Sequence, residues 1–529
     1  MRCCGVISPS SSPENTLSEC EVIMLSMKST RLIHTGYLIG LLCVVLTRPV
    51  LSAEGPMLIV GTPQADIKVD RSQDAKVLRT VKQGNRFWAF ATTENWYEVK
   101  DPKSQQHGWI SREQASPIQL TAEQMQKIKS AQETHSRAMK LYSSGDRKQA
   151  VQLGIQALEQ VKAVHGKYHP DTASVMSFPA VAYHELQDLE KATSYTEECL
   201  EIRRQVFGNA HPETAASLNN LGSLYVTLKR YSKAEPLLKE SLKLAHAQLG
   251  TKHQGTVSAM INLGSLYEAM GKYKQAETLY QQILSVMTQN YGKDHYRTSV
   301  VHDKMAKLYL QMQAYPQAEQ HMQQCHAIRQ KSLGETHPET VNALHERGRI
   351  YVMQEKYADA EPIFLKCLEL VSSETGENHL QTTILRDNLV MIFDHLDKYS
   401  EAEQLMLKNL KIRRDSLDQK HPDLLYSLNS LGNYYFARQE YSQALPYFKE
   451  ALEITQKTRG AEHPATAVAL GRLGNLYRMQ GKKLEAEPLL SQSLKINQKA
   501  LGADHRATIQ AQQNLAALNE TPEDDPPAE

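Results

Sequence analysis

The chain has 529 residues and carries 60 Lys and Arg against 59 Asp and Glu, which gives a formal net charge of +1. This balance leaves no basic surface of the size that nucleic acid or an anionic membrane requires. The length alone would indicate several globular domains. Most of the chain is a fixed internal repeat, however, so the number of domains expected from the length is too high.

The first 53 residues have the pattern of a targeting segment. Residues 27–31 form a short basic region, residues 37–46 form an apolar run, and small residues lead up to Ala53. This order is typical of a cleaved secretory signal, preceded here by an extension ahead of Met24 that indicates a later true start. We therefore predict export, to the periplasm or beyond, and an uncleaved segment would tether the protein to the membrane.

Residues 54–118 differ from the rest of the chain in their sequence pattern. Short apolar runs alternate with Gly, Asn and Asp-Pro turns, which predicts the strands of a small β-barrel. All three tryptophans of the protein lie in this stretch. The predicted strands are residues 57–60, 75–78, 86–90, 95–99 and 108–110.

The runs Trp96-Tyr97-Glu98-Val99 and Gly108-Trp109-Ile110 follow Val81-Lys82-Gln83-Gly84 in this stretch. The combination resembles a bacterial SH3-like domain. The resemblance implies an aromatic groove at Trp96 and Tyr97 that binds a peptide or cell-wall material. The alternative is that these side chains fill the core, which is our interpretation of Trp109 because it follows Gly108 into the last strand.

Helical patterns occupy the remainder. Residues 119–168 are predicted to form a degenerate first helix pair, and residues 169–504 form eight repeats of 42 residues. Residues 505–519 form a single capping helix, and the proline-rich acidic tail 520–529 is predicted to be disordered. Each repeat and the capping helix begin with a histidine: His169, His211, His253, His295, His337, His379, His421, His463 and His505.

Each repeat is predicted to contain two amphipathic helices. Leu218, Leu221 and Tyr225 lie at helical intervals on one apolar stripe, and Gly222 and Ala234 allow the two helices to approach closely. These slots resemble the tetratricopeptide repeat. The added segment Gly208-Asn209-Ala210-His211-Pro212 and the run Leu218-Asn219-Asn220-Leu221 resemble its kinesin light chain type. The predicted fold is therefore mostly α, a tetratricopeptide solenoid or superhelix of helix pairs behind the small SH3-like β-barrel. The resemblance implies a scaffold that holds peptide segments of partner proteins in a concave groove.

The periodic histidines are interpreted as helix starts and not as metal ligands. Pro at the first helical position, and Thr or an acidic residue after it, suit the exposed amides of a helix N-terminus. One histidine per repeat, displaced along the array, does not converge on one ion. Cys199, Cys325 and Cys367 share one slot and are expected to form neither disulfides nor metal sites. We expect no cofactor, no metal and no enzymatic activity, because the chain has none of the usual catalytic motifs.

Polar residues of the first helix in each repeat are the predicted peptide-binding groove. An asparagine amide both donates and accepts, so it can pair with an extended peptide of any sequence. Basic residues on the same face would favour acidic partner segments. The alternative for each residue is a solvated position on a helix surface. The predicted groove residues are Asn219, Asn220, Asn262, Lys307, Arg349, Asn388, Asn429, Asn433, Arg472, Asn475, Arg478 and Asn514.

Two functions follow from these patterns. The first is a non-catalytic scaffold that binds proteins or peptides through the repeats. The second is a cell-envelope adaptor that binds cell-wall material through the SH3-like domain. Neither function involves nucleic acid, and the membrane enters only through an uncleaved signal.

Overall fold

The computed structural model describes residues 57–83, 86–101, 106–418 and 420–519. The predicted signal segment and the predicted disordered tail lie outside these ranges. The chain divides into two compact units, one ending at Lys293 and one beginning at Asp294, and each is described by itself. Every helix in the described ranges falls short of the length or the apolar character needed to cross a bilayer.

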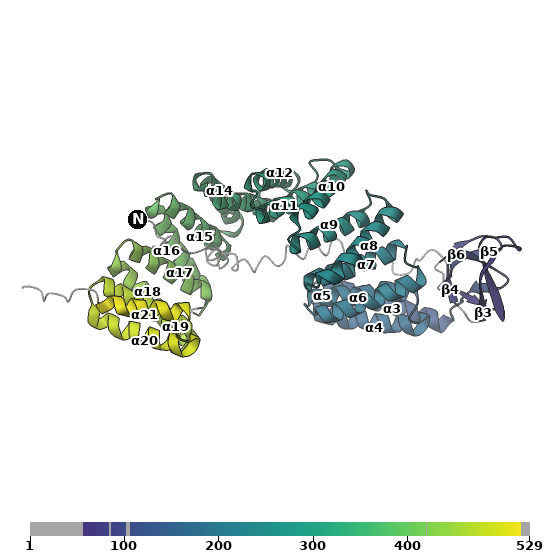
Figure 1. Ribbon diagram of the computed structural model, residues 1–529, viewed down its shortest axis with the longest axis horizontal. Helices are drawn as coiled ribbons and strands as arrows, with labels where there is room; N and C mark the ends of the chain where they lie inside the picture. The colour runs from purple at the N-terminus through teal and green to yellow at the C-terminus, as the bar shows by residue number, and fades with distance from the viewer. Residues whose placement is uncertain (1–56, 84–85, 102–105, 419, 520–529) are drawn as a thin grey trace, which may run out of the picture. The chain divides into compact units, whose positions relative to one another are not determined.

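The first unit begins with a small antiparallel β domain, coloured purple in Figure 1. Its strand order is β3-β2-β6-β5-β4-β1-β7. The five predicted runs all contribute strands, and β2 and β7 are additional. The strands are β1 (Met57–Val60), β2 (Gln64–Lys68), β3 (Val77–Lys82), β4 (Arg86–Thr92), β5 (Trp96–Lys100), β6 (His107–Ser111) and β7 (Ala115–Pro117).

Strand pairing decides which aromatic residues of the β domain face inward. Glu98 pairs with Trp109 across β5 and β6, and side chains alternate between the two faces of a strand. Tyr97 is 2% exposed and lies in the core, whereas Trp96 and Trp109 are half-buried on the opposite face. The interpretation of Trp109 as a core residue is therefore wrong, because its neighbours Gly108 and Ile110 occupy the inward positions.

The first unit continues as a run of antiparallel helices, each packed on the next (Figure 1). The pair α3 and α4 is followed by three repeats. The helices are α3 (Ala122–Ser143), α4 (Arg147–His165), α5 (Pro170–Glu185), α6 (Leu189–Val206), α7 (Pro212–Thr227), α8 (Tyr231–Leu249), α9 (Gln254–Ala269) and α10 (Tyr273–Tyr291).

The second unit consists of five further helix pairs and one last helix, and consecutive helices again pack together. The helices are α11 (Tyr296–Gln311), α12 (Tyr315–Leu333), α13 (Pro338–Met353), α14 (Tyr357–Thr375), α15 (Leu380–His395), α16 (Tyr399–Ser416), α17 (Pro422–Ala437), α18 (Tyr441–Arg459), α19 (Pro464–Met479), α20 (Lys483–Leu501) and α21 (Arg506–Asn519).

Each first helix of a repeat, and α21, begins at a periodic histidine. His211 Nδ1 accepts the backbone N–H of Glu213 at 3.2 Å, and the other eight histidines make the same bond. The imidazole is thus the N-cap, a role that the sequence pattern assigned to the residues after it. Thr214 Oγ1 instead donates to the carbonyl of Gly208, which ends the preceding segment in the left-handed region at φ 87°.

The two helices of a repeat meet through one close contact. A Cβ added to Gly222 would lie 2.6 Å from Leu238, and a Cβ added to Gly432 would lie 2.5 Å from Phe448. The same contact recurs at Gly264, Gly348 and Gly474, each below a large side chain of the second helix. The three repeats that lack this glycine have Ala180, Ala306 and Val390 in its place, and they have Thr196, Met322 and Met406 at the repeat position of the large second-helix residue. A larger first-helix residue therefore goes with a smaller or more flexible partner, as close packing requires.

The substitution Gly264→Leu tests this packing. Its side chain would meet the buried ring of Tyr280, since a Cβ alone would lie 2.8 Å from Cε1. We expect the free energy of unfolding to fall by about 1 to 3 kcal/mol, measured by chemical denaturation. Ala269→Leu, an exposed position on the same helix, is the control and should change it by less than about 0.5 kcal/mol. Equal stability of the two variants would contradict the close-packing explanation.

Candidate functional site

The candidate groove face is the set of twelve predicted polar residues on the first helices and on α21. The structure places them on α7, α9, α11, α13, α15, α17, α19 and α21. Their hydrogen bonds divide them into three groups. One group links successive repeats, one pairs within its own helix, and one has no described side-chain hydrogen bond.

Four of the residues are used between repeats. Asn219 is 8% exposed and donates from Nδ2 to Ser258 on α9 at 3.2 Å. Asn388 donates to His345 Nε2 on α13 at 3.2 Å. Arg472 donates to Asn429 Oδ1 at 2.7 Å, which ties α19 to α17. These side chains hold neighbouring first helices together and have less capacity left for a ligand.

Three more residues are paired within their own helices. Lys307 Nζ lies 2.8 Å from Asp303, and Asn514 accepts from Gln510 at 3.2 Å. Arg349 contacts both carboxylate oxygens of Glu346 at 2.8 Å. Burial raises the pKa of Glu346, but His345 and Arg349 outweigh it and hold that pKa at about 2, so the carboxylate is ionised. The positive charges of Lys307 and Arg349 are therefore balanced by these carboxylates, and the two residues add little net positive charge to the candidate groove face.

The remaining five residues make no side-chain hydrogen bond within the described ranges. They are Asn220 and Asn262 in the first unit, and Asn433, Asn475 and Arg478 in the second. Asn433 is exposed, whereas Asn475 and Arg478 are half-buried, and Asn475 Oδ1 and Arg478 Nε lack partners. Polar groups held in place without partners are the part of the face best suited to an incoming peptide.

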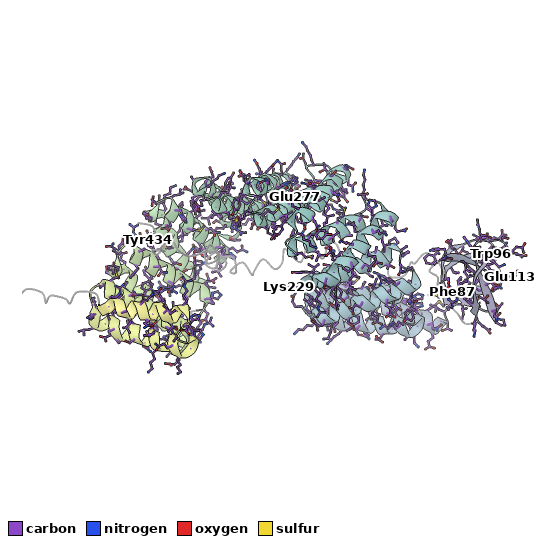
Figure 2. The ribbon with its side chains drawn as sticks, viewed as in Figure 1. Phe87, Trp96, Glu113, Lys229, Glu277 and Tyr434 are labelled. Atoms are coloured by element: carbon purple, nitrogen blue, oxygen red, sulfur yellow. The ribbon has the colours of Figure 1, made fainter. Side chains whose placement is uncertain are left out.

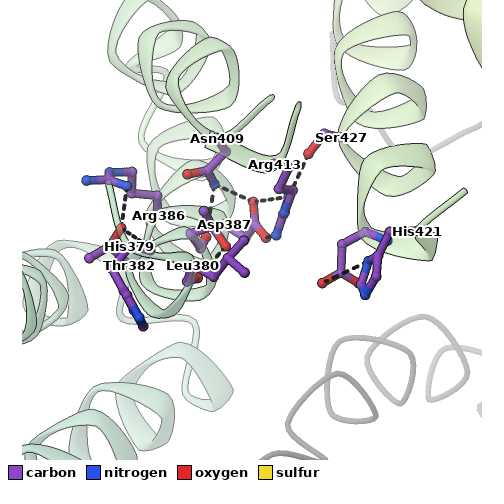
Figure 3. Close-up of polar contacts among 11 residues, drawn as sticks. His379, Leu380, Thr382, Arg386, Asp387, Asn409, Arg413, His421 and Ser427 are labelled. Carbon is purple, nitrogen blue, oxygen red and sulfur yellow. Dashed lines mark hydrogen bonds and ion pairs between the residues drawn. The ribbon is translucent and has the colours of Figure 1, made fainter. Parts of the chain in front are cut away.

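A buried polar network in the second unit was missed by the sequence patterns (Figure 3). Arg413 on α16 is 3% exposed, forms an ion pair with Asp387 on α15 and donates to Ser427 on α17 at 2.6 Å. Asn409 donates to the same Asp387 at 2.7 Å. Asp387 occupies the repeat position of Asn219, and Arg203 uses the position of Arg413 to reach Ser217 at 2.7 Å. Comparing equivalent positions of the repeats would have revealed this network.

A histidine pair in the second unit was missed as well. His302 stands where most other repeats have an apolar residue such as Leu218, and its Nδ1 lies 2.9 Å from Nδ1 of His321. The ring of Tyr309 stacks on His321 at 5.4 Å. Burial, and secondarily the neighbouring imidazole, lowers the pKa of His302 to about 4, and burial lowers that of His321. One ring must donate and the other accept, so the pair is stable only while it is not doubly protonated.

The outer face of the β domain carries aromatic rings beside cations. Lys68 Nζ lies 5.8 Å from the centre of the Trp96 ring, and the Arg71 guanidinium lies 5.1 Å from that of Trp109. Figure 2 labels Trp96 on this domain together with Phe87, which belongs to the core. Of the two predicted groove residues, only Trp96 is at the surface, and Trp109 replaces the buried Tyr97 beside it.

Three of the seven cysteines, Cys199, Cys325 and Cys367, lie in the described ranges; all three are buried, and none of them is in a disulfide. Burial raises the pKa of the Cys325 thiol to about 12 and that of the Cys367 thiol to about 12. Thiols that stay protonated at neutral pH are poor nucleophiles and poor metal ligands. Their shared slot therefore serves packing.

The histidine pair predicts a specific pH dependence. Because the pKa of His302 is lowered in the folded state, the folded state favours the neutral ring. The contribution of this ring to stability is therefore lost as the pH falls from about 6.5 towards about 4. Between these pH values the free energy of unfolding should fall by roughly 1 to 3 kcal/mol less in the variant His302→Leu/His321→Leu than in the parent. The measurement is urea unfolding at several pH values. Parallel curves for the two proteins would show that the pair does not titrate with unfolding.

A comparison with solved structures finds several chains to which this one is similar. Similar solved structures include BtubC (BKLC) from P. vanneervenii, at 19% identity over 49% of this chain and 94% of that one, with a TM-score of 0.37. A putative kinesin light chain from Podosopora anserina is 19% identical over 55% and 98% of the two chains, with a TM-score of 0.19. The quorum sensor NprR from B. thuringiensis is 13% identical over 61% and 87%, with a TM-score of 0.41. A search of curated protein sequences finds no match.

The family assignment comes from the sequence itself. The tetratricopeptide repeat model matches seven overlapping segments: residues 180–247, 229–289, 255–331, 297–373, 339–415, 380–457 and 423–499. Together they span more than half of the chain and follow the 42-residue period of its helix pairs. The protein belongs to the tetratricopeptide repeat family, whose members are generally non-catalytic scaffolds for protein–protein interaction.

Proposed function

We propose that the protein is a non-catalytic scaffold that binds extended peptide segments of partner proteins on the candidate groove face, centred on α17 and α19. The observation that supports this proposal most directly is the set of uncommitted side chains Asn433, Asn475 and Arg478. Their neighbours Asn429 and Arg472 are bonded to each other between the same two helices. The repeats are therefore held together without them.

The chemistry of these three side chains suits a peptide backbone. An asparagine amide offers two donors and one acceptor oxygen, which match the C=O and N–H groups of an extended chain. The two asparagines lie on successive first helices, so a peptide crossing both would meet a repeated pair of amides. Recognition of this kind depends on the backbone and tolerates different partner sequences.

The charge of the face favours an acidic partner segment. Carboxylates of their own helices compensate Lys307 and Arg349, so the positive charge available to a ligand comes from Arg478 on α19, which makes no ion pair among the described residues. Charges at the edge of an interface act mainly on association rate and specificity. We therefore expect partner binding to weaken as the salt concentration rises.

The combined variant Asn433→Ala/Asn475→Ala/Arg478→Ala tests this site. Loss of two amides and one guanidinium should reduce partner recovery at least about tenfold, since uncompensated loss of a few polar contacts costs more than about 1.4 kcal/mol. Helicity should remain unchanged, because none of the three side chains makes a described hydrogen bond. The measurement is quantitative pull-down and crosslinking in a native envelope extract, with helicity followed by circular dichroism.

The matched control is Gln492→Ala/Lys495→Ala/Gln498→Ala, which removes two amides and one cation from exposed positions of the second helix α20. The control should recover partners as the parent does. Unchanged recovery by the groove variant, or an equal loss in the control, would refute the placement of the site.

A second candidate function is that of an exported adaptor, in which the β domain acts as an SH3-like module that binds cell-wall material. The outward aromatic rings of Trp96 and Trp109 with their cations favour this proposal, because aromatic rings and cations on one surface suit sugar faces and anionic groups. Export is proposed from the predicted signal segment alone. Release of the segment ending at Ala53, detected by N-terminal sequencing of the mature protein, would support it.

The variant Trp96→Ala/Trp109→Ala tests the adaptor function. Both side chains are outside the core, so the fold should persist while sedimentation of the protein with purified peptidoglycan is lost. Tyr168→Ala, which removes an aromatic residue that is 49% exposed outside the β domain, is the control and should sediment as the parent does. Absence of parent sedimentation, or equal sedimentation of all three proteins, would exclude the adaptor function.

A further inference from the structure

One periodic histidine differs from the other eight. His169 is 7% exposed, whereas the others are half-buried or exposed. It lies at the junction of α4 and α5, together with His165 at the end of α4 and Asp171 in the first turn of α5. One ligand atom from each of these three residues lies within 4.8 Å of the other two.

The distances in this cluster approach those of a metal site. Asp171 Oδ2 lies 3.5 Å from His165 Nε2 and 3.7 Å from His169 Nδ1. Two ligands bound to one tetrahedral zinc ion are about 3.3 Å apart, given bonds of about 2.0 to 2.1 Å. The spacing His-x₃-His-x-Asp also places the ligands within a few residues of each other, a condition that the periodic histidines alone do not meet.

Two of the three residues, His165 and Asp171, have polar groups without adequate partners. His165 Nε2 is buried and makes no hydrogen bond. Asp171 is 7% exposed, and its only described ion-pair partners are the two imidazoles, which carry charge only when protonated. A buried carboxylate without a permanent positive partner is unfavourable, and a divalent cation would supply the missing charge and fill the open position of His165.

The equivalent positions of the next repeat show what is particular to this junction. Phe207 takes the place of His165, and its ring stacks on His211 at 4.4 Å. The rings of His165 and His169 stack in the same way at 4.0 Å with an interplanar angle of 9°. An apolar ring is therefore sufficient for packing in this slot, and the imidazole nitrogen at residue 165 is an addition that packing does not require.

We propose that His165, His169 and Asp171 form a binding site for one divalent transition-metal ion of the zinc class. Two imidazoles and one carboxylate are ligands that such ions accept, with water completing the tetrahedron. Because the lone pairs of two stacked rings lie in separate, nearly parallel planes, one ring tilts when the ion binds, and His169 exchanges its bond to the Asp171 amide for the metal. The ion ties the end of α4 to the start of α5 and so joins the first helix pair to the repeats.

The test uses the full chain without a histidine tag, freed of metal by a chelator and titrated with Zn²⁺ and Co²⁺. We expect one equivalent of Zn²⁺ to bind and raise the melting temperature, and Co²⁺ to give the visible absorption of a tetrahedral site. His165→Phe installs the ring that Phe207 provides in the next repeat, so the variant should fold normally and bind Zn²⁺ at least about tenfold more weakly. Asp171→Asn should weaken binding similarly.

The matched control is His253→Asn, which changes a capping histidine outside the cluster to another good N-cap residue. It should bind Zn²⁺ as the parent does. Stoichiometric binding that survives in His165→Phe, or that falls equally in His253→Asn, would overturn the site. The site would also be overturned if the parent binds no Zn²⁺ below about 100 µM, which corresponds to a binding free energy weaker than about 5.5 kcal/mol.

Discussion

The close contact between the two helices of each repeat is the constraint on which the rest of the array depends. A glycine on the first helix admits a large side chain from the second, as Gly264 admits Tyr280. Because each helix packs mainly on its neighbours in sequence, no distant part of the fold can absorb a misfit in one repeat. The pairing of Ala306 with Met322, where the glycine is missing, keeps the combined volume similar and the period unchanged.

Polar side chains add hydrogen bonds to the junctions between helices that pack through apolar contacts. The junctions use an imidazole as N-cap and a threonine hydroxyl turned back to the preceding glycine, as in His211 and Thr214. Buried arginines then cross from one repeat to the next, as Arg413 does towards Ser427. These bonds satisfy groups that a purely apolar seam would leave without partners, so they specify the register of neighbouring helices.

The same polar interactions determine which side chains remain available for a ligand. Polar residues of the first helices that bridge repeats are committed, and those without a described side-chain hydrogen bond lie on α7 and α9 in the first unit and on α17 and α19 in the second. The junction of α4 and α5 follows an analogous logic, because His165 contributes a nitrogen that neither packing nor capping uses. In both places the functional candidates are the side chains left over after the requirements of the fold have been met.

Much of the fold could be predicted because the residues that begin a helix, end a helix and form its packed apolar stripe recur at fixed intervals in the sequence. The small β domain was predictable as strands, but β2 and β7 lack a strong apolar run and were not found. The assignment of Trp109 to the core was wrong, since the choice between faces depends on a one-residue register that pairing with Glu98 decides.

The sequence by itself determined the helix pairs, their period and the residues that could line a groove, because those properties depend on spacing along one chain. Only the tertiary structure decided which of these residues remain available. Asn219 and Asn433 have the same chemistry, yet Asn219 is held by Ser258 of the next repeat and Asn433 is exposed. The physical reason is that a hydrogen bond across repeats depends on the distance between two side chains about 40 residues apart, which no local pattern encodes.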